Sequence, residues 1–142
     1  MPCPSKVARV YEQCVRAYWH RLWTEGDFSF AHEFYAPSFL VNGVERTPAQ
    51  FARSAEAFRG HFDDMVVSVE RVFLLDDGVV SRVRYRAHYS GGFSGLQVVG
   101  AGIDVTGLDV FRFEHGLVIE HLHEADHEAL WEQLGVKLPP GD

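Results

Sequence analysis

The sequence has few cysteines and no long hydrophobic run. Among its 142 residues only Cys3 and Cys14 are cysteines, so we expect neither a disulfide framework nor a cysteine-based zinc site, as suits a reducing cytoplasm. No apolar stretch approaches a membrane span, and the N-terminus has no apolar core typical of a signal peptide. We therefore predict a cytoplasmic protein with no membrane partner.

Positive charge is also scarce. The sequence has 13 Lys and Arg against 20 Asp and Glu, which gives a formal net charge of −7. The basic residues are scattered rather than gathered in a stripe, and a negative surface repels phosphate backbones. Nucleic acid is therefore not expected as a partner.

Hydrophobic and aromatic residues are plentiful by comparison. Hydrophobic residues make up 46% of the chain, and its length is that of one domain, so we predict a single domain over residues 1–142. Aromatic residues account for 13%, with 11 Phe and 3 Trp. Core packing explains most of them, and the remainder could line an apolar pocket.

The spacing of apolar residues divides the chain into a helical part and a strand part. Repeats of three and four residues predict helices, and runs of β-branched and aromatic residues around turn sequences predict two hairpins. The expected helices cover residues 5–25, 27–35, 47–60 and 126–135, and the expected strands cover 39–42, 65–75, 79–89, 98–113 and 117–124. This order predicts an α+β fold with the helices on one face of the sheet. A strongly bent sheet would leave a hollow suited to a small molecule.

Near the C-terminus, the segment from His123 to His127 matches the H-E-x-x-H zinc signature, in which two histidines one helical turn apart bind the metal. However, His121 and His123 alternate with Leu122 as residues do in a strand, and few candidates for a third ligand follow. We therefore expect no metal, and we expect His121 and His123 to face solvent or a partner subunit. The competing interpretation is a lone carboxylate, Asp126, where a strand passes into the last helix.

Several segments carry a resemblance to a known family. They are Trp23-Thr24-Glu25-Gly26-Asp27, Thr106-Gly107-Leu108-Asp109-Val110-Phe111-Arg112-Phe113, Glu120 to Asp126, and Gln133-Leu134-Gly135. Through them the chain resembles the SnoaL-like polyketide cyclases and, more distantly, the ketosteroid isomerases of the nuclear transport factor 2-like superfamily. The resemblance implies a cone-shaped barrel, in which a strongly curved, mostly antiparallel sheet wraps around three N-terminal helices and a short C-terminal helix follows. It also implies a homodimer and an enzyme without a cofactor.

Two carboxylates are candidates for catalysis. Asp109 lies inside an apolar strand, so it is either satisfied by a structural partner such as Thr106 or Arg112, or is an acid with a raised pKa. By resemblance it matches the isomerase Asp that stays neutral and donates to the substrate oxyanion. Asp126 matches the catalytic acid/base of the SnoaL-like cyclases, and it is also a good N-cap for the last helix.

The isomerase resemblance weakens at other positions. The general base of those enzymes would fall on Asn42 or Gly43, and neither side chain can abstract a proton from carbon. Their phenol donor would fall on Trp19, with Tyr18 adjacent. The isomerase mechanism therefore cannot apply in full to this chain.

The resulting hypothesis is a cofactor-independent cyclase or isomerase that performs acid/base chemistry on a small apolar carbonyl compound in a deep cavity. Asp126 and Asp109 are its expected catalytic residues. The residues expected to bind the substrate are Tyr18, Trp19, Phe34, Tyr85, Tyr89, Phe111 and Glu124. The alternatives are a non-catalytic binding module for an apolar ligand, and an epoxide hydrolase or dehydratase (a lyase) of the same fold.

Overall fold

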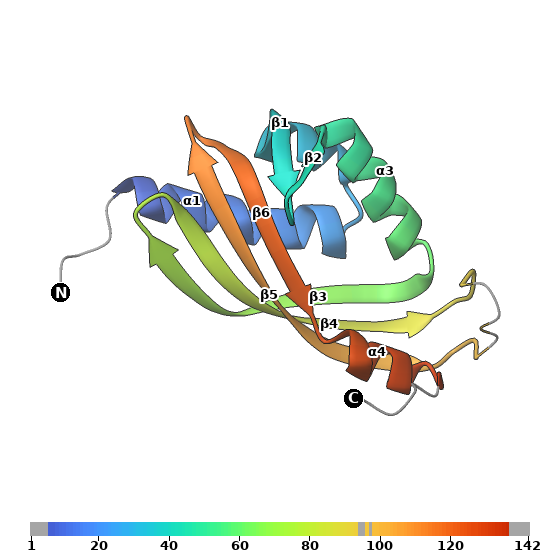
Figure 1. The fold of residues 1–142 in the computed structure, drawn as a ribbon. Helices are drawn as coiled ribbons and strands as arrows, with labels where there is room; N and C mark the ends of the chain where they lie inside the picture. Colours follow the sequence, from blue (N-terminus) through green and yellow to red (C-terminus); the bar gives the residue numbers. More distant parts are fainter. Residues whose placement is uncertain (1–5, 94–95, 97, 137–142) are drawn as a thin grey trace.

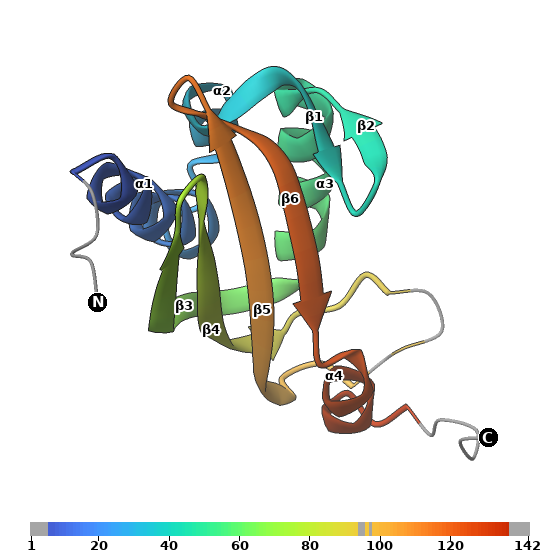
Figure 2. The same ribbon diagram turned by 60° about the vertical axis from the view of Figure 1, so that its left-hand side comes forward.

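The computed structural model describes residues 6–93, 96 and 98–136. It is an α+β fold in which one curved, six-stranded sheet is packed against the N-terminal helices. These helices lie on the concave side of the sheet, and the last helix follows the end of the last strand (Figure 1 and Figure 2). The predicted fold class is confirmed. Cys3 lies outside the described residues. None of the described helices is long and apolar enough to cross a membrane.

The first predicted helix is present but changes its winding. Helix α1 (Lys6–Ala17) continues into the π-helical segment η1 (Tyr18–Thr24). A π-helical turn is wider than an α-helical one, and such turns are frequent at functional sites. It brings the adjacent residues Tyr18 and Trp19 into the core together, each about 1% exposed.

The remaining helices are short. A 3₁₀ turn, η2 (Phe28–Phe30), leads into α2 (Ala31–Phe34), and α4 covers His127–Gln133. Helix α3 (Pro48–Arg59) begins with a capping box, in which Gln50 N–H donates to the Thr47 hydroxyl and Thr47 N–H donates to the Gln50 side chain.

The strands follow the order β2-β1-β6-β5-β4-β3 across the sheet. Their bounds are β1 (Tyr35–Val41), β2 (Val44–Arg46), β3 (Phe62–Leu75), β4 (Gly78–Tyr89), β5 (Gly102–Glu114) and β6 (Leu117–Ala125). Neighbours are antiparallel except β1 and β6, which are parallel. The first strands of the chain therefore lie beside the last one.

A bulge in β6 sets the register of the β5–β6 hairpin. Phe113 pairs with Val118, but Arg112 pairs with Glu120, so Ile119 is an extra residue on β6. Beyond this point Asp109 lies opposite His123. Because cross-strand partners point to the same face, Asp109 and His123 share the concave side of the sheet.

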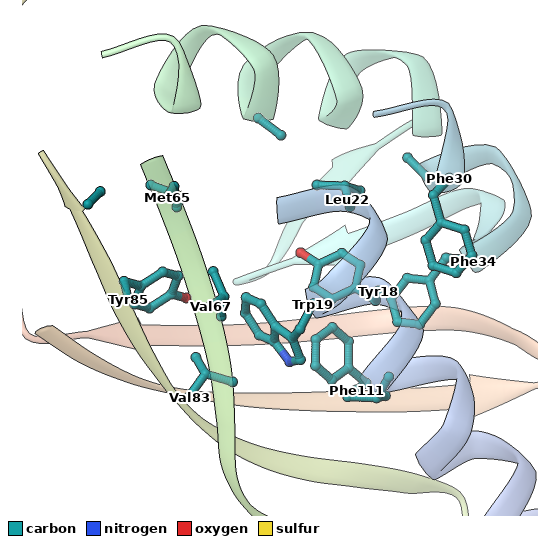
Figure 3. Close-up of a cluster of buried hydrophobic side chains, with 14 of the residues drawn as sticks. Tyr18, Trp19, Leu22, Phe30, Phe34, Met65, Val67, Val83, Tyr85 and Phe111 are labelled. Carbon is teal, nitrogen blue, oxygen red and sulfur yellow. The ribbon is translucent and has the colours of Figure 1, made fainter. Parts of the chain in front are cut away.

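The core is dominated by aromatic side chains between η1 and the sheet. Tyr18 stacks on Phe34 with ring centroids 4.6 Å apart and meets Phe111 edge to face at 5.3 Å. Trp19 lies beside Phe111 and near Tyr85 (Figure 3). Its indole N–H donates to the buried Ser81 hydroxyl. These contacts hold η1 against the concave face of the sheet.

Candidate functional site

A cavity of about 300 Å³ lies between the concave face of the sheet and the helices η1, α3 and α4. Most of its wall is aromatic or aliphatic, including Tyr18, Trp19 and Tyr85. Besides the tyrosines, the ionisable residues in the wall are Asp109, His121, His123, Asp126 and His127. An apolar hollow with a few convergent polar groups is the usual form of a small-molecule site.

Asp109 is the centre of the polar part of the wall. Its side chain is fully buried on β5, and two histidines of β6 meet the same carboxylate oxygen. His121 Nε2 lies 2.5 Å from Asp109 Oδ2, and His123 Nδ1 lies 2.9 Å from it. The second oxygen, Oδ1, is buried and has no hydrogen-bond partner among the described residues.

A chain of hydrogen bonds continues from His121 into the core. The Tyr35 hydroxyl lies 2.8 Å from His121 Nδ1 and 3.3 Å from the Tyr18 hydroxyl, which accepts a bond from Trp23 Nε1–H. The Tyr35 hydroxyl has one proton to donate, either to Tyr18 or to His121. A neutral histidine that donates from Nε2 must accept at Nδ1, so in this tautomer the Tyr35 proton goes to His121 and Tyr35 accepts from the Tyr18 hydroxyl. The bond between Tyr35 and His121 fixes which nitrogen of His121 faces Asp109.

The cluster favours an ionised Asp109 between two histidines of different basicity. Burial opposes ionisation of Asp109, but the hydrogen bonds from His121 and His123 outweigh it and lower its pKa. Burial lowers the pKa of His121, and the neighbouring Asp109 does not compensate. For the less buried His123, burial is outweighed by the hydrogen bond and charge of Asp109, so its pKa is raised. An ionised Asp109 has no proton to donate, unlike the isomerase carboxyl that it matches in the resemblance.

The backbone of His123 is held by Asn42, which lies in the turn between β1 and β2. Asn42 accepts from His123 N–H at 2.9 Å and donates from Nδ2 to His123 O at 3.3 Å. Asn42 itself has a φ of 48° in the tight turn between β1 and β2, and Asn tolerates this left-handed conformation. One of the two residues that the resemblance matches to the isomerase base therefore positions a histidine.

Asp126 lies at the junction of β6 and α4. Its Oδ1 accepts from Ala129 N–H at 3.0 Å, so it is the N-cap of α4. The residue is exposed, and it also belongs to the cavity wall. Asp109 and Asp126 therefore border one cavity, and the second carboxylate oxygen of Asp126 has no hydrogen-bond partner among the described residues.

The structure places the expected substrate-binding residues in three locations. Tyr18, Trp19 and Tyr85 line the cavity. Phe34, Phe111 and Tyr89 are buried in the core and are not among the lining residues of the cavity. Glu124 is exposed and lines a separate, shallow hollow with Arg82 and Thr106, because its backbone partner is the exposed Leu108 on the convex face.

The expectation that His121 and His123 face solvent or a partner was wrong. His121 is 3% exposed and His123 is half-buried, and both point toward Asp109. The partners suggested for Asp109, Thr106 and Arg112, are not its hydrogen-bond partners: Arg112 bonds instead to Asp77 and Glu120. A buried carboxylate needs partners on its own face of the sheet, and this was the signal that could have identified the histidines.

The same three side chains are the candidates for a metal ligand set. One ligand atom from each of Asp109, His121 and His123 lies within 4.8 Å of the others. Zinc bonds of about 2.0–2.1 Å would hold tetrahedral ligands about 3.3 Å apart, wider than the hydrogen bonds found here. A metal would have to spread the cluster. The H-E-x-x-H pattern does not form a helical pair, because His123 lies in β6 and His127 begins α4.

A curved sheet over a helical layer, with an apolar cavity and a buried polar cluster, has the general form of a small-molecule site. The chain belongs to the SnoaL-like polyketide cyclase family, whose model matches residues 12–134. This membership supports a small-molecule cyclase or isomerase-like function. None of the curated proteins matches the chain significantly.

Solved structures agree with this fold. A proposed polyketide cyclase from Acidithiobacillus ferrooxidans superposes with a TM-score of 0.82 at 21% identity, over 95% of this chain and 98% of that one. A proposed SnoaL-like polyketide cyclase from Jannaschia has a TM-score of 0.81 at 22% identity, over 99% and 100%. A Catenulispora acidiphila protein with a ketosteroid isomerase-like fold, solved with trimethylamine, has a TM-score of 0.71 at 14% identity, over 90% and 98%.

Proposed function

We propose that the protein is a cyclase or isomerase that moves protons next to a carbonyl group of a small apolar compound held in the cavity. The observation that carries this proposal is the grouping of ionisable side chains in a wall that is otherwise mainly apolar. A dry, apolar surrounding strengthens electrostatic interactions and allows pKa values to be tuned for proton transfer. Membership of the SnoaL-like family supports the same class of reaction.

The cavity suits a compact, largely planar compound with few charges. Trp19, Trp23 and Tyr85 offer broad apolar faces for contact with a ring system. Asp126 at one side of the wall and the Asp109 cluster at another provide groups that can take up and return a proton. No cofactor is needed for proton transfer beside a carbonyl.

Binding and turnover can be tested with aromatic compounds that carry several carbonyl groups. Trp19 and Trp23 line the cavity, so a bound aromatic ketone should quench their fluorescence. Products of ring closure or double-bond migration should then be found by mass spectrometry. Asp126→Asn should slow formation of the product, whereas Glu128→Gln, an exposed change in the same helical turn, should not.

The result also decides between an enzyme and a binding module. Saturable quenching with no product from any compound, and with the same quenching in Asp126→Asn as in the wild type, would contradict the proposed chemistry. It would favour the alternative of a non-catalytic module that encloses an apolar ligand. Loss of turnover in Asp126→Asn with unchanged quenching would support catalysis, because binding is then retained.

A further inference from the structure

We infer that His123 is the catalytic base of this site, and that Asp109, His121 and Tyr35 are positioning residues that orient it. This assignment rests on the proposed function and specifies which group removes the proton. The family resemblance and the sequence pattern both directed attention to Asp126 instead. The geometry around Asp109 distinguishes His123 from Asp126.

His123 combines contact with the cavity and a fixed orientation. It belongs to the cavity wall, and 33% of its side chain is exposed, whereas Asp109 is fully buried. Its Nδ1 is occupied by Asp109 Oδ2, at 2.9 Å. Among the described residues Nε2 has no hydrogen-bond partner, so it is the nitrogen left to meet a molecule in the cavity.

Asp109 selects the protonation state that a base requires. A carboxylate accepts hydrogen bonds, so the neutral imidazole of His123 carries its proton on Nδ1 and keeps the lone pair on Nε2. When Nε2 takes a proton, the negative charge of Asp109 stabilises the imidazolium. This is the role of the aspartate in Asp–His pairs of hydrolases, where it orients the ring without itself becoming protonated.

His121 and Tyr35 keep the carboxylate in this role. His121 is almost wholly buried, its Nε2 donates to the same oxygen of Asp109, and its Nδ1 accepts from Tyr35. Both ring nitrogens of His121 are therefore engaged within the protein, and His121 supplies a second donor that favours ionised Asp109. The two hydrogen bonds between the Asn42 side chain and the His123 backbone, here called the Asn42 clamp, add a second constraint from the β1–β2 turn.

The proton-transfer step is balanced without any further reactant. His123 Nε2 removes a proton from the carbon next to the carbonyl, and the C–H electron pair forms the enolate while the carbonyl π pair moves to oxygen. In an isomerisation the imidazolium returns the proton to a different carbon. In an aldol-type closure the enolate carbon bonds to a second carbonyl carbon, and the imidazolium protonates the new alkoxide.

A simple ketone can test the base without knowledge of the natural substrate. In D₂O, 2-tetralone exchanges its C1 protons, which lie between the carbonyl and the aromatic ring, through the same kind of enolate, and ¹H NMR measures the rate. The wild-type protein should accelerate this exchange, and His123→Gln should lower the acceleration by about 100-fold or more, the usual effect of a general base. His88→Gln is the matched control, because His88 is exposed on β4 and does not line the cavity.

The pH profile separates positioning by Asp109 from a structural role. The base is active when His123 is unprotonated, so the wild-type rate rises with pH through its raised pKa. Asp109→Asn removes the charge that raises this pKa, so the rise should move to lower pH and reach a lower plateau. A structural defect alone would lower the rate without moving the inflection. Besides Asp109, the titratable groups around His123 are His121, Glu124, Tyr18, Tyr85, Asp126 and His127.

The outcomes distinguish this assignment from the proposed function. No acceleration by the wild-type protein would overturn both. Acceleration that survives in His123→Gln and is lost in Asp126→Asn would leave the acid/base function standing and remove His123 as its base. ¹⁵N NMR of the wild-type imidazoles tests the orientation independently of any variant: the proton of neutral His123 should be on Nδ1, and a proton on Nε2 would overturn the assignment.

Discussion

Asp109 bonds to the residue directly across the hairpin and also to the one diagonal to it. His123 is its backbone partner, whereas His121 is the partner of Phe111, yet both imidazoles reach the same oxygen of Asp109. Two donors on one oxygen compensate a buried carboxylate that would otherwise be costly. The contact between β5 and β6 at this point therefore depends on a single charge.

Removal of His121 should destabilise the fold strongly. His121→Leu leaves an ionised, buried Asp109 with one donor, and loss of a hydrogen bond to a buried charge costs about 1.5–3 kcal/mol of unfolding free energy. Urea denaturation measures this loss. The same substitution in an Asp109→Asn background should cost less, because no charge is left uncompensated. Additive losses in this double-mutant cycle would show that the two side chains are not coupled.

Stability at acid pH should depend on Asp109. Its folded pKa is lowered from 3.8, so its contribution is present above the unfolded pKa and is lost as the pH falls through the folded pKa. As the pH falls below about 4, the wild-type protein should therefore lose more unfolding free energy than Asp109→Asn. Denaturation midpoints over this range provide the measurement, and parallel curves for the two proteins would contradict it.

Asp126 should show separable capping and chemical roles. Asp126→Ala removes the cap of α4 and should cost about 1 kcal/mol, whereas Asp126→Ser keeps an oxygen for Ala129 N–H and should be close to wild type in stability. Neither variant has a carboxylate. Turnover of the cyclase or isomerase reaction should fall in both, and equal turnover in Asp126→Ser and wild type would remove Asp126 from the chemistry.

The Asn42 clamp should affect catalysis more than stability. Asn42→Gly keeps a residue that tolerates positive φ but loses both side-chain bonds to the His123 backbone. We expect about a tenfold lower rate of ketone proton exchange, because small misplacements of a reacting group are costly, with a thermal midpoint near that of wild type. Asn42→Asp, which retains the acceptor for His123 N–H, should lie between the two. A wild-type rate in Asn42→Gly would show that the clamp has no functional effect.

Gly107 should be a sensitive position for the shape of the cavity. A Cβ there would lie 3.0 Å from Tyr85 Cε2 and 3.3 Å from Glu124 O, so Gly107→Ala must displace the Tyr85 ring that lines the cavity. We expect a loss of about 1–3 kcal/mol, typical of overpacking, and weaker quenching by aromatic ketones. Gly102→Ala on the same strand is the control, since the atom nearest to a Cβ at that position, Cδ2 of His88, is 4.0 Å away. Equal binding by both variants would contradict the prediction.

The fold was largely predictable because its strands obey a simple alternation. Along β4, odd-numbered residues such as Val83 and Tyr85 are buried, while Arg82 and Arg86 are exposed. The turn signals around this strand and at Thr47-Pro48 define element ends by local chemistry. The π-helical winding of η1 was not predicted, because its apolar spacing also fits an ordinary helix.

The site was less predictable because one bulge decides it. Counting outward from the paired ends Glu114 and Leu117 would set Asp109 opposite Leu122, with both histidines on the other face. The extra residue Ile119 shifts the register by one and brings His123 opposite Asp109. No composition rule reveals such a bulge, and on β6 it directs histidines inward and Leu122 outward, against their hydrophobicity.

The parallel pairing of β1 with β6 has a consequence for the order of folding. Tyr35 on β1 meets His121, 86 residues later in the chain, and β1 has only β2 and β6 as neighbours. During synthesis β1 therefore cannot complete its pairing until β6 has left the ribosome, and contacts of such long sequence separation slow the search for the native state. The cluster around Asp109 should accordingly be among the last features to form, so an unfinished chain would carry the aromatic core before it carries the proton-transfer groups.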